Sequence, residues 1–245
     1  MLSGWSTIDI AGKRADVFYP PGGLPRFALL YLHTVGEESL ADNPTYTAAL
    51  ADRRLACCVP HGKQSWWSDR VCPDFDPVLT TEKHLIDNVL PWMAAKWPEL
   101  AGKPIGVFGI SMGGQGAIRL GFRYSKLFPV VAGVSSAFDY HDWYGRGTPI
   151  DDMYRSKEAC RQDTAILQIR PPHFPPHIWF ACDPDDEWHR GNDRLHEKLQ
   201  AIGIAHTSDL STRHGGHSWD YFDSKADTVL SFLVENLEKQ NRRLM

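Results

Sequence analysis

One serine of this chain stands between two glycines, where an apolar run gives way to small residues. The segment Ile105–Leu120 reads IGVFGISMGGQGAIRL, and its residues 109–113 fit the pattern G-x-S-x-G. Glycines at these positions remove side chains that would collide in a tight turn from a strand into a helix, and such a turn presents the serine hydroxyl as a nucleophile. A five-residue pattern also arises by chance. Ser111 is therefore either a nucleophile or only a hydroxyl in a Gly-rich turn.

A serine hydroxyl is a poor nucleophile until an imidazole takes its proton, and a carboxylate must orient that imidazole. The segment DPDDEWHRGN, after the apolar run HIWFAC, contains the aspartates 183, 185 and 186. The segment STRHGGHSWDYF, after IAHTSDL, contains His214 and His217 on either side of two glycines. The chain order Ser, Asp, His is that of an α/β-hydrolase. The ordered triplet favours catalysis over a Gly-rich turn without chemistry.

Strands alternating with helices are predicted to position these groups. Apolar runs predict strands over 26–33, 56–60, 103–110, 128–136, 177–182 and 204–210, and helical periodicity predicts helices over 45–55, 80–97, 111–124, 190–203 and 219–239. Residues 6–19 alternate around Ala11-Gly12 and predict a hairpin. The expected fold is a single three-layer α/β domain over 1–245, its mostly parallel sheet edged by the antiparallel hairpin. Function in such a fold collects at the carboxyl ends of the strands.

Composition excludes several classes of protein. The 245 residues carry a net charge of −4, with acids and bases mixed along the chain, so no nucleic-acid or membrane partner is expected. No apolar run is long enough to span a bilayer, and the N-terminus does not resemble a secretory signal. Five cysteines without a framework spacing favour a reduced, cytoplasmic protein. A homodimer is one assembly that this composition allows.

Aromatic residues near the predicted strand ends are candidates for the substrate pocket. Trp66 and Trp67 cannot both face a core if their segment is extended, so one is expected to pack and the other to line the pocket. The segment 139–176 is rich in Pro, Gly and charge, and it reads as an excursion near the active site. Within it, Trp143 and Tyr144 are expected to wall the opposite side of the pocket.

Other patterns do not support a metal or another cofactor. DPDDEW could suggest a calcium loop, but Trp188 stands where such a loop needs glycine. His173 and His177 are separated by two prolines, which forbid the helix that would align them. Cys57 and Cys58 fall in a predicted buried strand and are expected to be core thiols. We expect no cofactor.

Three segments resemble the putative-esterase (esterase D-like) family of α/β-hydrolases, which includes S-formylglutathione hydrolases, feruloyl esterases and mycolyltransferases. They are GISMGGQGA, GGHSWDYF and CDPDDEWHRGNDRLHEKL, within a looser similarity from about residue 26 to 235. The resemblance implies that Ser111 is the nucleophile and His217 the base, with His214 a replaceable neighbour. The family's acid stands five residues before a Gly-Asn pair, which implies Asp186, with Asp185 as the second choice. Asp183 and Asp185 would then cap the turn around Pro184.

The resemblance also implies an oxyanion hole. One donor is expected to be the N–H of Met112 at the start of a helix, where the dipole favours negative charge. The second is expected in the segment HTVGEES, from the N–H of Thr34 or Val35. Family members have a glycine directly after this histidine, whereas here two residues precede Gly36. His33 is expected to brace the loop.

These observations predict a serine esterase acting on a small carboxylic ester or thioester through an acyl-enzyme on Ser111. An acyltransferase with the same triad, in which an alcohol replaces water, is not separated from it by the sequence. A peptidase is a weaker alternative, because no propeller or cap domain is present. The alternative from another functional class is a binding module that has the hydrolase fold but no catalytic activity.

Overall fold

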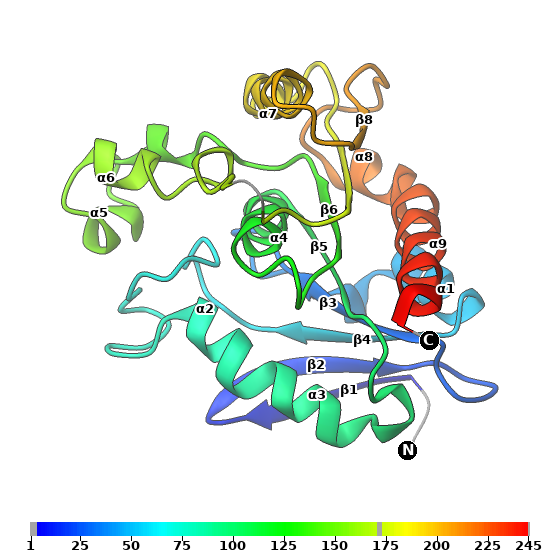
Figure 1. Cartoon of the computed structure of the whole chain (residues 1–245). Helices are drawn as coiled ribbons and strands as arrows, with labels where there is room; N and C mark the ends of the chain where they lie inside the picture. The colour runs from blue at the N-terminus through cyan, green and yellow to red at the C-terminus, as the bar shows by residue number, and fades with distance from the viewer. Residues whose placement is uncertain (1–3, 171–172, 245) are drawn as a thin grey trace.

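An eight-stranded sheet forms the centre of the computed structural model, which describes residues 4–170 and 173–244 (Figure 1). The strands are β1 (Gly4–Ile10), β2 (Lys13–Tyr19), β3 (Phe27–Leu32), β4 (Leu55–Pro60), β5 (Gly106–Ile110), β6 (Val130–Val134), β7 (His177–Ala181) and β8 (Thr207–Asp209). Their order is β1-β2-β4-β3-β5-β6-β7-β8. β1 pairs antiparallel with β2 and β2 with β4, and the remaining pairs are parallel. The predicted parallel sheet with an antiparallel hairpin at its edge is confirmed.

The hairpin turn follows from two residues with left-handed backbone. Ala11 has φ 52° and Gly12 has φ 79°. Two successive positive φ values give a turn whose twist matches that of the flanking strands. Gly4 of β1 therefore pairs with Tyr19 of β2, and Ile10 with Lys13.

Helices cover both faces of the sheet. They are α1 (Pro44–Asp52), α2 (Thr81–His84), η2 (Leu85–Val89), α3 (Leu90–Lys96), α4 (Met112–Arg123), α5 (Ile150–Met153), α6 (Lys157–Arg161), α7 (His189–Ala201), α8 (Trp219–Ser224) and α9 (Ala226–Leu244), with short turns η1 (Leu40–Asp42), η3 (Pro98–Leu100), η4 (Tyr140–Trp143) and η5 (Ala165–Leu167). Leu30 and Leu32 of β3 belong to one hydrophobic cluster together with residues of α3, α4 and α7, whereas Leu29 and Tyr31 belong to a second cluster with residues of α1, α8 and α9. The central strands are apolar on both faces because both are covered.

Two helices differ from the sequence-based prediction. The predicted helix 80–97 contains a π-helical turn at η2, where the Leu90 N–H donates to the Leu85 carbonyl. This turn lies directly before Pro91, which has no N–H to continue the α-helical pattern. The predicted helix 219–239 is divided at Lys225, which ends α8. The buried ammonium of this residue donates to Asp209 at 2.7 Å.

The segment 139–176, which the sequence predicts to be an excursion near the active site, contains the short helices η4, α5, α6 and η5. Its residues 171 and 172 lie outside the described part of the chain. In Figure 1, α5 and α6 extend to the side of the molecule away from α9. Among the described residues, no helix combines the length and apolar character needed to cross a membrane.

Candidate active site

Ser111 lies in a sharp turn between β5 and α4. Its backbone has φ 56° and ψ −117°, a combination that residues with a Cβ rarely adopt. The Ser111 N–H donates to the Val134 carbonyl at 2.9 Å, and the Ser111 carbonyl accepts from the N–H groups of Gln115 and Ala137 at 3.1 Å each. These bonds to β6, to the segment after it and to the first turn of α4 hold the strained conformation in place.

The two glycines of the motif make this turn sterically feasible. A Cβ on Gly109 would lie 2.3 Å from the carbonyl of Gly113, and a Cβ on Gly113 would lie 1.8 Å from the Leu32 carbonyl oxygen. Backbone atoms cannot move aside as the end of a flexible side chain can, so both positions require glycine. Because neither glycine has a side chain, the start of α4 can lie against the end of β3.

Three side chains from separate strand ends form a continuous hydrogen-bonded chain. His217 Nε2 lies 3.0 Å from Ser111 Oγ, and His217 Nδ1 lies 2.8 Å from Asp186 Oδ2. The Asp186 carboxylate is buried, and its second oxygen accepts the Trp188 N–H at 2.8 Å. Because an ionised carboxylate only accepts, Nδ1 carries a proton, which leaves Nε2 free to accept from the serine.

The start of α8 and an aromatic ring hold His217. Ser218 is the N-cap of α8, and its side chain accepts the Tyr221 N–H. The Phe222 ring meets the His217 ring nearly edge-on, with centroids 5.1 Å apart. The helix therefore ends the loop one residue after His217, and its Phe222 ring packs against the imidazole.

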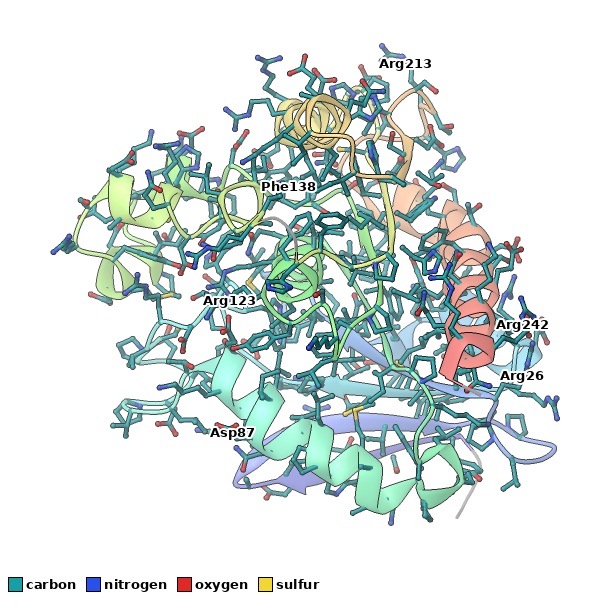
Figure 2. The ribbon with its side chains drawn as sticks, viewed as in Figure 1. Arg26, Asp87, Arg123, Phe138, Arg213 and Arg242 are labelled. Carbon is teal, nitrogen blue, oxygen red and sulfur yellow. The ribbon has the colours of Figure 1, made fainter. Side chains whose placement is uncertain are left out.

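The other candidates in these loops lie elsewhere. Asp185, the second choice for the acid, pairs with Arg213, and Figure 2 shows Arg213 at the outer edge of the molecule. Asp183 accepts the Asp185 N–H, as a turn cap would. Its other oxygen accepts the N–H groups of His214 and Gly216, which the sequence did not indicate. His214 is exposed. The Trp188 N–H on the acid was also missed, since a backbone donor has no residue-type signal.

The loop after β3, residues 33–38, is braced by His33, as predicted. His33 is buried, its Nδ1 donates to the Thr34 carbonyl at 2.6 Å, and its Nε2 accepts the Gly62 N–H at 2.9 Å. The Thr34 hydroxyl donates to Glu38 and accepts the Gly36 N–H at 3.1 Å. Met112 is the first residue of α4, where backbone N–H groups have no partner within the helix.

We expect acid to weaken the fold partly through His33. Burial lowers the pKa of His33 from 6.5 to about 4. Between these values the unfolded chain binds the proton and the folded chain does not. The free energy of unfolding therefore falls as the pH drops through this window, by about 3 kcal/mol from this residue, and the contribution is complete above it.

Urea denaturation of the wild type and of His33→Asn at about pH 7 and about pH 4.5 checks this prediction. The variant should be less stable at the higher pH, because it loses the bonds to Thr34 and Gly62. It should lose less stability on acidification than the wild type. Equal losses in the two proteins would contradict the assignment.

Trp66 and Trp67 are both 1% exposed, so the expectation that only one of them packs is wrong. They have φ values of 57° and 52°, so the segment is not extended and both rings turn inward. The Trp66 ring stacks on Tyr140 with centroids 4.4 Å apart. The Trp67 indole donates to the His33 carbonyl at 3.2 Å. Trp67 therefore supports the loop that His33 braces.

Trp143 lies on the same side as Trp66, which corrects the expectation of an opposite wall. Its ring meets Trp66 edge-on at 5.6 Å and lies 5.6 Å from the Trp188 ring. Trp143 and Tyr144 are both half-buried and pack on the same core. Trp143 thus joins the loop after β4 to the acid loop, residues 182–188.

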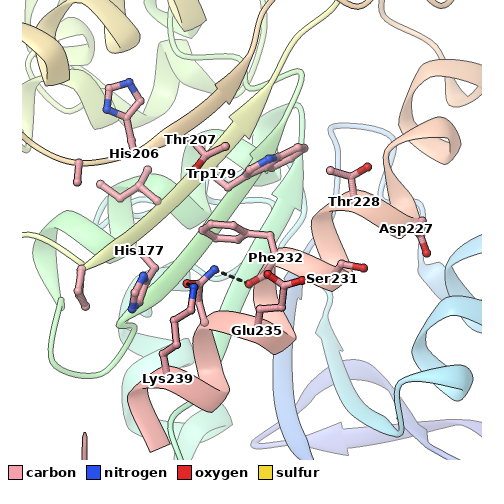
Figure 3. A pocket seen from close by; sticks show the side chains of 14 residues that line it. His177, Trp179, His206, Thr207, Asp227, Thr228, Ser231, Phe232, Glu235 and Lys239 are labelled. Atoms are coloured by element: carbon pink, nitrogen blue, oxygen red, sulfur yellow. Dashed lines mark hydrogen bonds between the residues drawn. The ribbon is translucent and has the colours of Figure 1, made fainter. Parts of the chain in front are cut away.

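A groove of about 630 Å³ lies between α9 and the β7–β8 edge, with Trp179 and Phe232 among its lining residues (Figure 3). None of Ser111, Asp186 and His217 lines it. The groove includes the first residues of β7, whereas the hydrogen-bonded chain lies beyond the carboxyl ends of β5, β7 and β8. Within the described ranges, no three His, Cys, Asp or Glu side chains are grouped so as to hold a metal ion.

Comparison with known sequences agrees with the family resemblance of the three sequence segments. The family described as putative esterase matches residues 55–232. An acetyl esterase of Caldicellulosiruptor saccharolyticus is 27% identical over 133 residues, which are 47% of this chain and 48% of that protein. The chain thus matches about half the length of this curated relative.

Solved structures show the same fold. An S-formylglutathione hydrolase from Agrobacterium tumefaciens has a TM-score of 0.76 at 15% identity, over 95% of this chain and 94% of that one. A fluorophosphonate-binding serine hydrolase of Staphylococcus aureus has a TM-score of 0.74 at 16% identity, over 95% of this chain and 99% of that one. At such identities the likeness establishes the α/β-hydrolase fold.

The family match spans most of the chain, and its residues 55–232 include the serine, the aspartate and the histidine of the hydrogen-bonded chain. The fold, the strained turn at Ser111 and the sequence match agree. This chain belongs to the putative-esterase family.

Proposed function

We propose that this protein is a serine esterase that hydrolyses a small carboxylic ester or thioester through an acyl-enzyme on Ser111. The observation that carries the proposal is the hydrogen-bonded chain from Ser111 Oγ through His217 to Asp186. A nucleophile, a base and an orienting carboxylate are the groups that acyl transfer requires. Family membership and the name of the acetyl esterase relative support an ester as the substrate.

In the first half of the reaction, Ser111 Oγ attacks the acyl carbon while its proton passes to His217 Nε2. The Asp186 carboxylate stabilises the resulting imidazolium and remains ionised. The tetrahedral intermediate then collapses. The bond from the acyl carbon to the leaving oxygen or sulfur breaks, and His217 gives its proton to the leaving group.

In the second half, water attacks the acyl-enzyme and His217 takes a proton from it. The second tetrahedral intermediate releases the carboxylic acid, and His217 returns the proton to Ser111 Oγ. The free enzyme is restored without any cofactor.

Met112 and Val35 are the donors we assign to the oxyanion hole. The Met112 N–H lies at the start of α4, where the helix dipole favours a negative charge. The Thr34 carbonyl accepts from His33 Nδ1. In a trans peptide the next N–H points the opposite way, so the Val35 N–H is directed away from His33. This argument favours Val35 over Thr34 as the second donor.

Labelling with a fluorophosphonate and turnover of p-nitrophenyl esters of increasing chain length, with S-formylglutathione as the thioester, test the proposal. An esterase labels on Ser111 and releases acid from at least one substrate. A silent binding module does neither. An acyltransferase converts an added alcohol into a new ester faster than it releases acid.

We expect acetyl and propionyl esters to be better substrates than longer ones, because we propose that Trp143 narrows the acyl site beside the acid loop. Trp143→Ala should move the preferred chain length upward in the p-nitrophenyl ester series. Trp92→Ala is the matched control, since Trp92 is also half-buried but packs against Trp97 near the end of α3. A profile unchanged in Trp143→Ala would show that this ring is structural.

The proposal also assigns the enzyme to the cytoplasm. All five cysteines are free and buried, which fits a protein that folds in a reducing compartment. Burial raises the pKa of the Cys57 and Cys58 thiols, so neither is a reactive thiolate.

A further inference from the structure

We propose that Asp183 is a positioning residue that holds the histidine loop, residues 211–218, against the acid loop, residues 182–188. The inference rests on the proposed function, because it concerns the placement of the base His217. Asp183 does not contact the imidazole of His217. It acts by accepting hydrogen bonds from backbone N–H groups of both loops.

One buried carboxylate joins the two loops. Asp183 is fully buried, and its Oδ1 accepts the Asp185 N–H at 2.8 Å within the acid loop. Its Oδ2 accepts the N–H groups of His214 and Gly216 in the histidine loop, the latter at 3.0 Å. Gly216 is the residue directly before His217. The carboxylate therefore fixes the peptide that leads into the base.

The charge of this carboxylate is maintained in its buried position. Burial by itself raises the pKa of Asp183, but the N–H groups of His214, Asp185 and Gly216, together with the charge of Arg213, outweigh it and lower the pKa. An ionised carboxylate has acceptor sites for all three N–H groups and no proton that would oppose them.

Apart from Asp183, hydrogen bonds hold the histidine loop mainly at its two ends, where Ser211 and Thr212 bond to Asp209 and Ser218 caps α8. It contains no strand or helix, and Gly215 and Gly216 have φ values of 94° and 66°. Its ion pair with the acid loop, Arg213 to Asp185, is 63% exposed on both sides and stabilises little. A loop with two consecutive glycines has many alternative conformations in the unfolded chain. The Asp183 bonds select one of them.

The position of His217 must be accurate for the reaction. Its Nε2 lies 3.0 Å from Ser111 Oγ, while its Nδ1 lies 2.8 Å from Asp186. A shift of the loop lengthens one of these bonds or both, and catalytic groups lose efficiency with displacements below 1 Å. Without Asp183, the N–H groups of His214 and Gly216 lose their acceptor, so the loop moves to find water or another partner.

The test is steady-state kinetics of Asp183→Ala and Asp183→Asn. Asp183→Ala should lower kcat by about 10²-fold, while KM changes by less than about threefold, because the variant disturbs the base and leaves the substrate pocket intact. Asp183→Asn keeps one acceptor oxygen and should lose about tenfold. Asp185→Asn, which removes only the exposed ion pair, is the matched control and should stay within about threefold.

A double-mutant cycle separates positioning from general destabilisation. If Asp183 serves to align His217 with Asp186, then Asp183→Ala should cost less than about threefold when Asp186→Asn is already present. A residue that merely stabilises the fold would cost the same factor in both backgrounds, and that result would overturn the inference. Urea denaturation shows which variants are folded at the assay temperature.

The remaining outcomes are also decisive. If Asp183→Ala does not fold, Asp183→Asn carries the test, and kcat equal to that of the wild type overturns the inference. Wild-type kcat in both variants overturns it as well. Ser111→Ala distinguishes the two proposals, since turnover in that variant would refute the esterase mechanism. Inactive Ser111→Ala together with fully active Asp183 variants would refute only the role of Asp183.

Discussion

Replacing Ser111 by alanine should lower kcat by on the order of 10⁴–10⁶-fold and abolish labelling by a fluorophosphonate. The substitution removes the only nucleophile in the hydrogen-bonded chain while His217 and Asp186 remain in place. Ser111 is 4% exposed, and within the described residues its hydroxyl bonds only to His217, so the variant should remain folded. Hydrolysis of p-nitrophenyl acetate and circular dichroism measure the two effects.

Ser136→Ala is the matched control for this prediction. Ser136 is fully buried, and its hydroxyl has no hydrogen-bond partner within the described part of the chain. Its loss should leave both labelling and kcat within about threefold of the wild type. Near-normal turnover in Ser111→Ala would disprove the acyl-enzyme, and labelling at a second serine would show that another nucleophile exists.

Removing the base or its acid should be nearly as severe. His217→Ala should eliminate almost all turnover, because no other imidazole contacts Ser111 Oγ in the described structure. Asp186→Asn should lower kcat by about 10⁴-fold, since the amide favours the wrong imidazole tautomer. Only neutral imidazole accepts the serine proton, so protonation of His217 should stop the reaction and kcat/KM of the wild type should rise with pH.

His214→Ala and Asp185→Asn are the neighbouring controls for the triad assignment. Both side chains lie outside the hydrogen-bonded chain, so His214→Ala should retain activity within about tenfold of the wild type and Asp185→Asn within about threefold. The rise of kcat/KM with pH should persist in His214→Ala. The small activity that remains in His217→Ala should not show this rise. A loss in Asp185→Asn equal to that in Asp186→Asn would mean that the acid is misassigned.

Local patterns in the sequence determined the architecture and pointed to Ser111 as the proposed nucleophile. Apolar runs alternating with helical periodicity predicted the parallel sheet, and the turn at Ala11-Gly12 predicted the edge hairpin. The sharp turn at Ser111 requires glycine at 109 and 113, a few residues from the serine. The spacing of these residues in the sequence was therefore enough to identify the turn. Each of these features depends on short stretches of backbone, whose conformation the residue types themselves restrict.

Tertiary structure decided the direction in which side chains point. Both tryptophans, at 66 and 67, turn inward because their backbone is left-handed. The pattern of residue types around them does not predict this backbone conformation. The helix predicted over 219–239 breaks at Lys225, whose partner Asp209 stands 16 residues earlier in the chain. In both places the side chains contact segments that are distant in the sequence, Tyr140 and His33 for the tryptophans and Asp209 for Lys225.

The three aspartates of the acid loop illustrate the same division most clearly. The sequence placed them after β7, and the family register distinguished Asp186 from its neighbours. The partners of each one lie 28 to 33 residues away in the histidine loop: Arg213 for Asp185, the N–H groups of His214 and Gly216 for Asp183, and the His217 ring for Asp186. Residues one or three positions apart in a turn point in different directions. Only the packing of the two loops beyond β7 and β8 determines which carboxylate meets the imidazole and which meets the backbone.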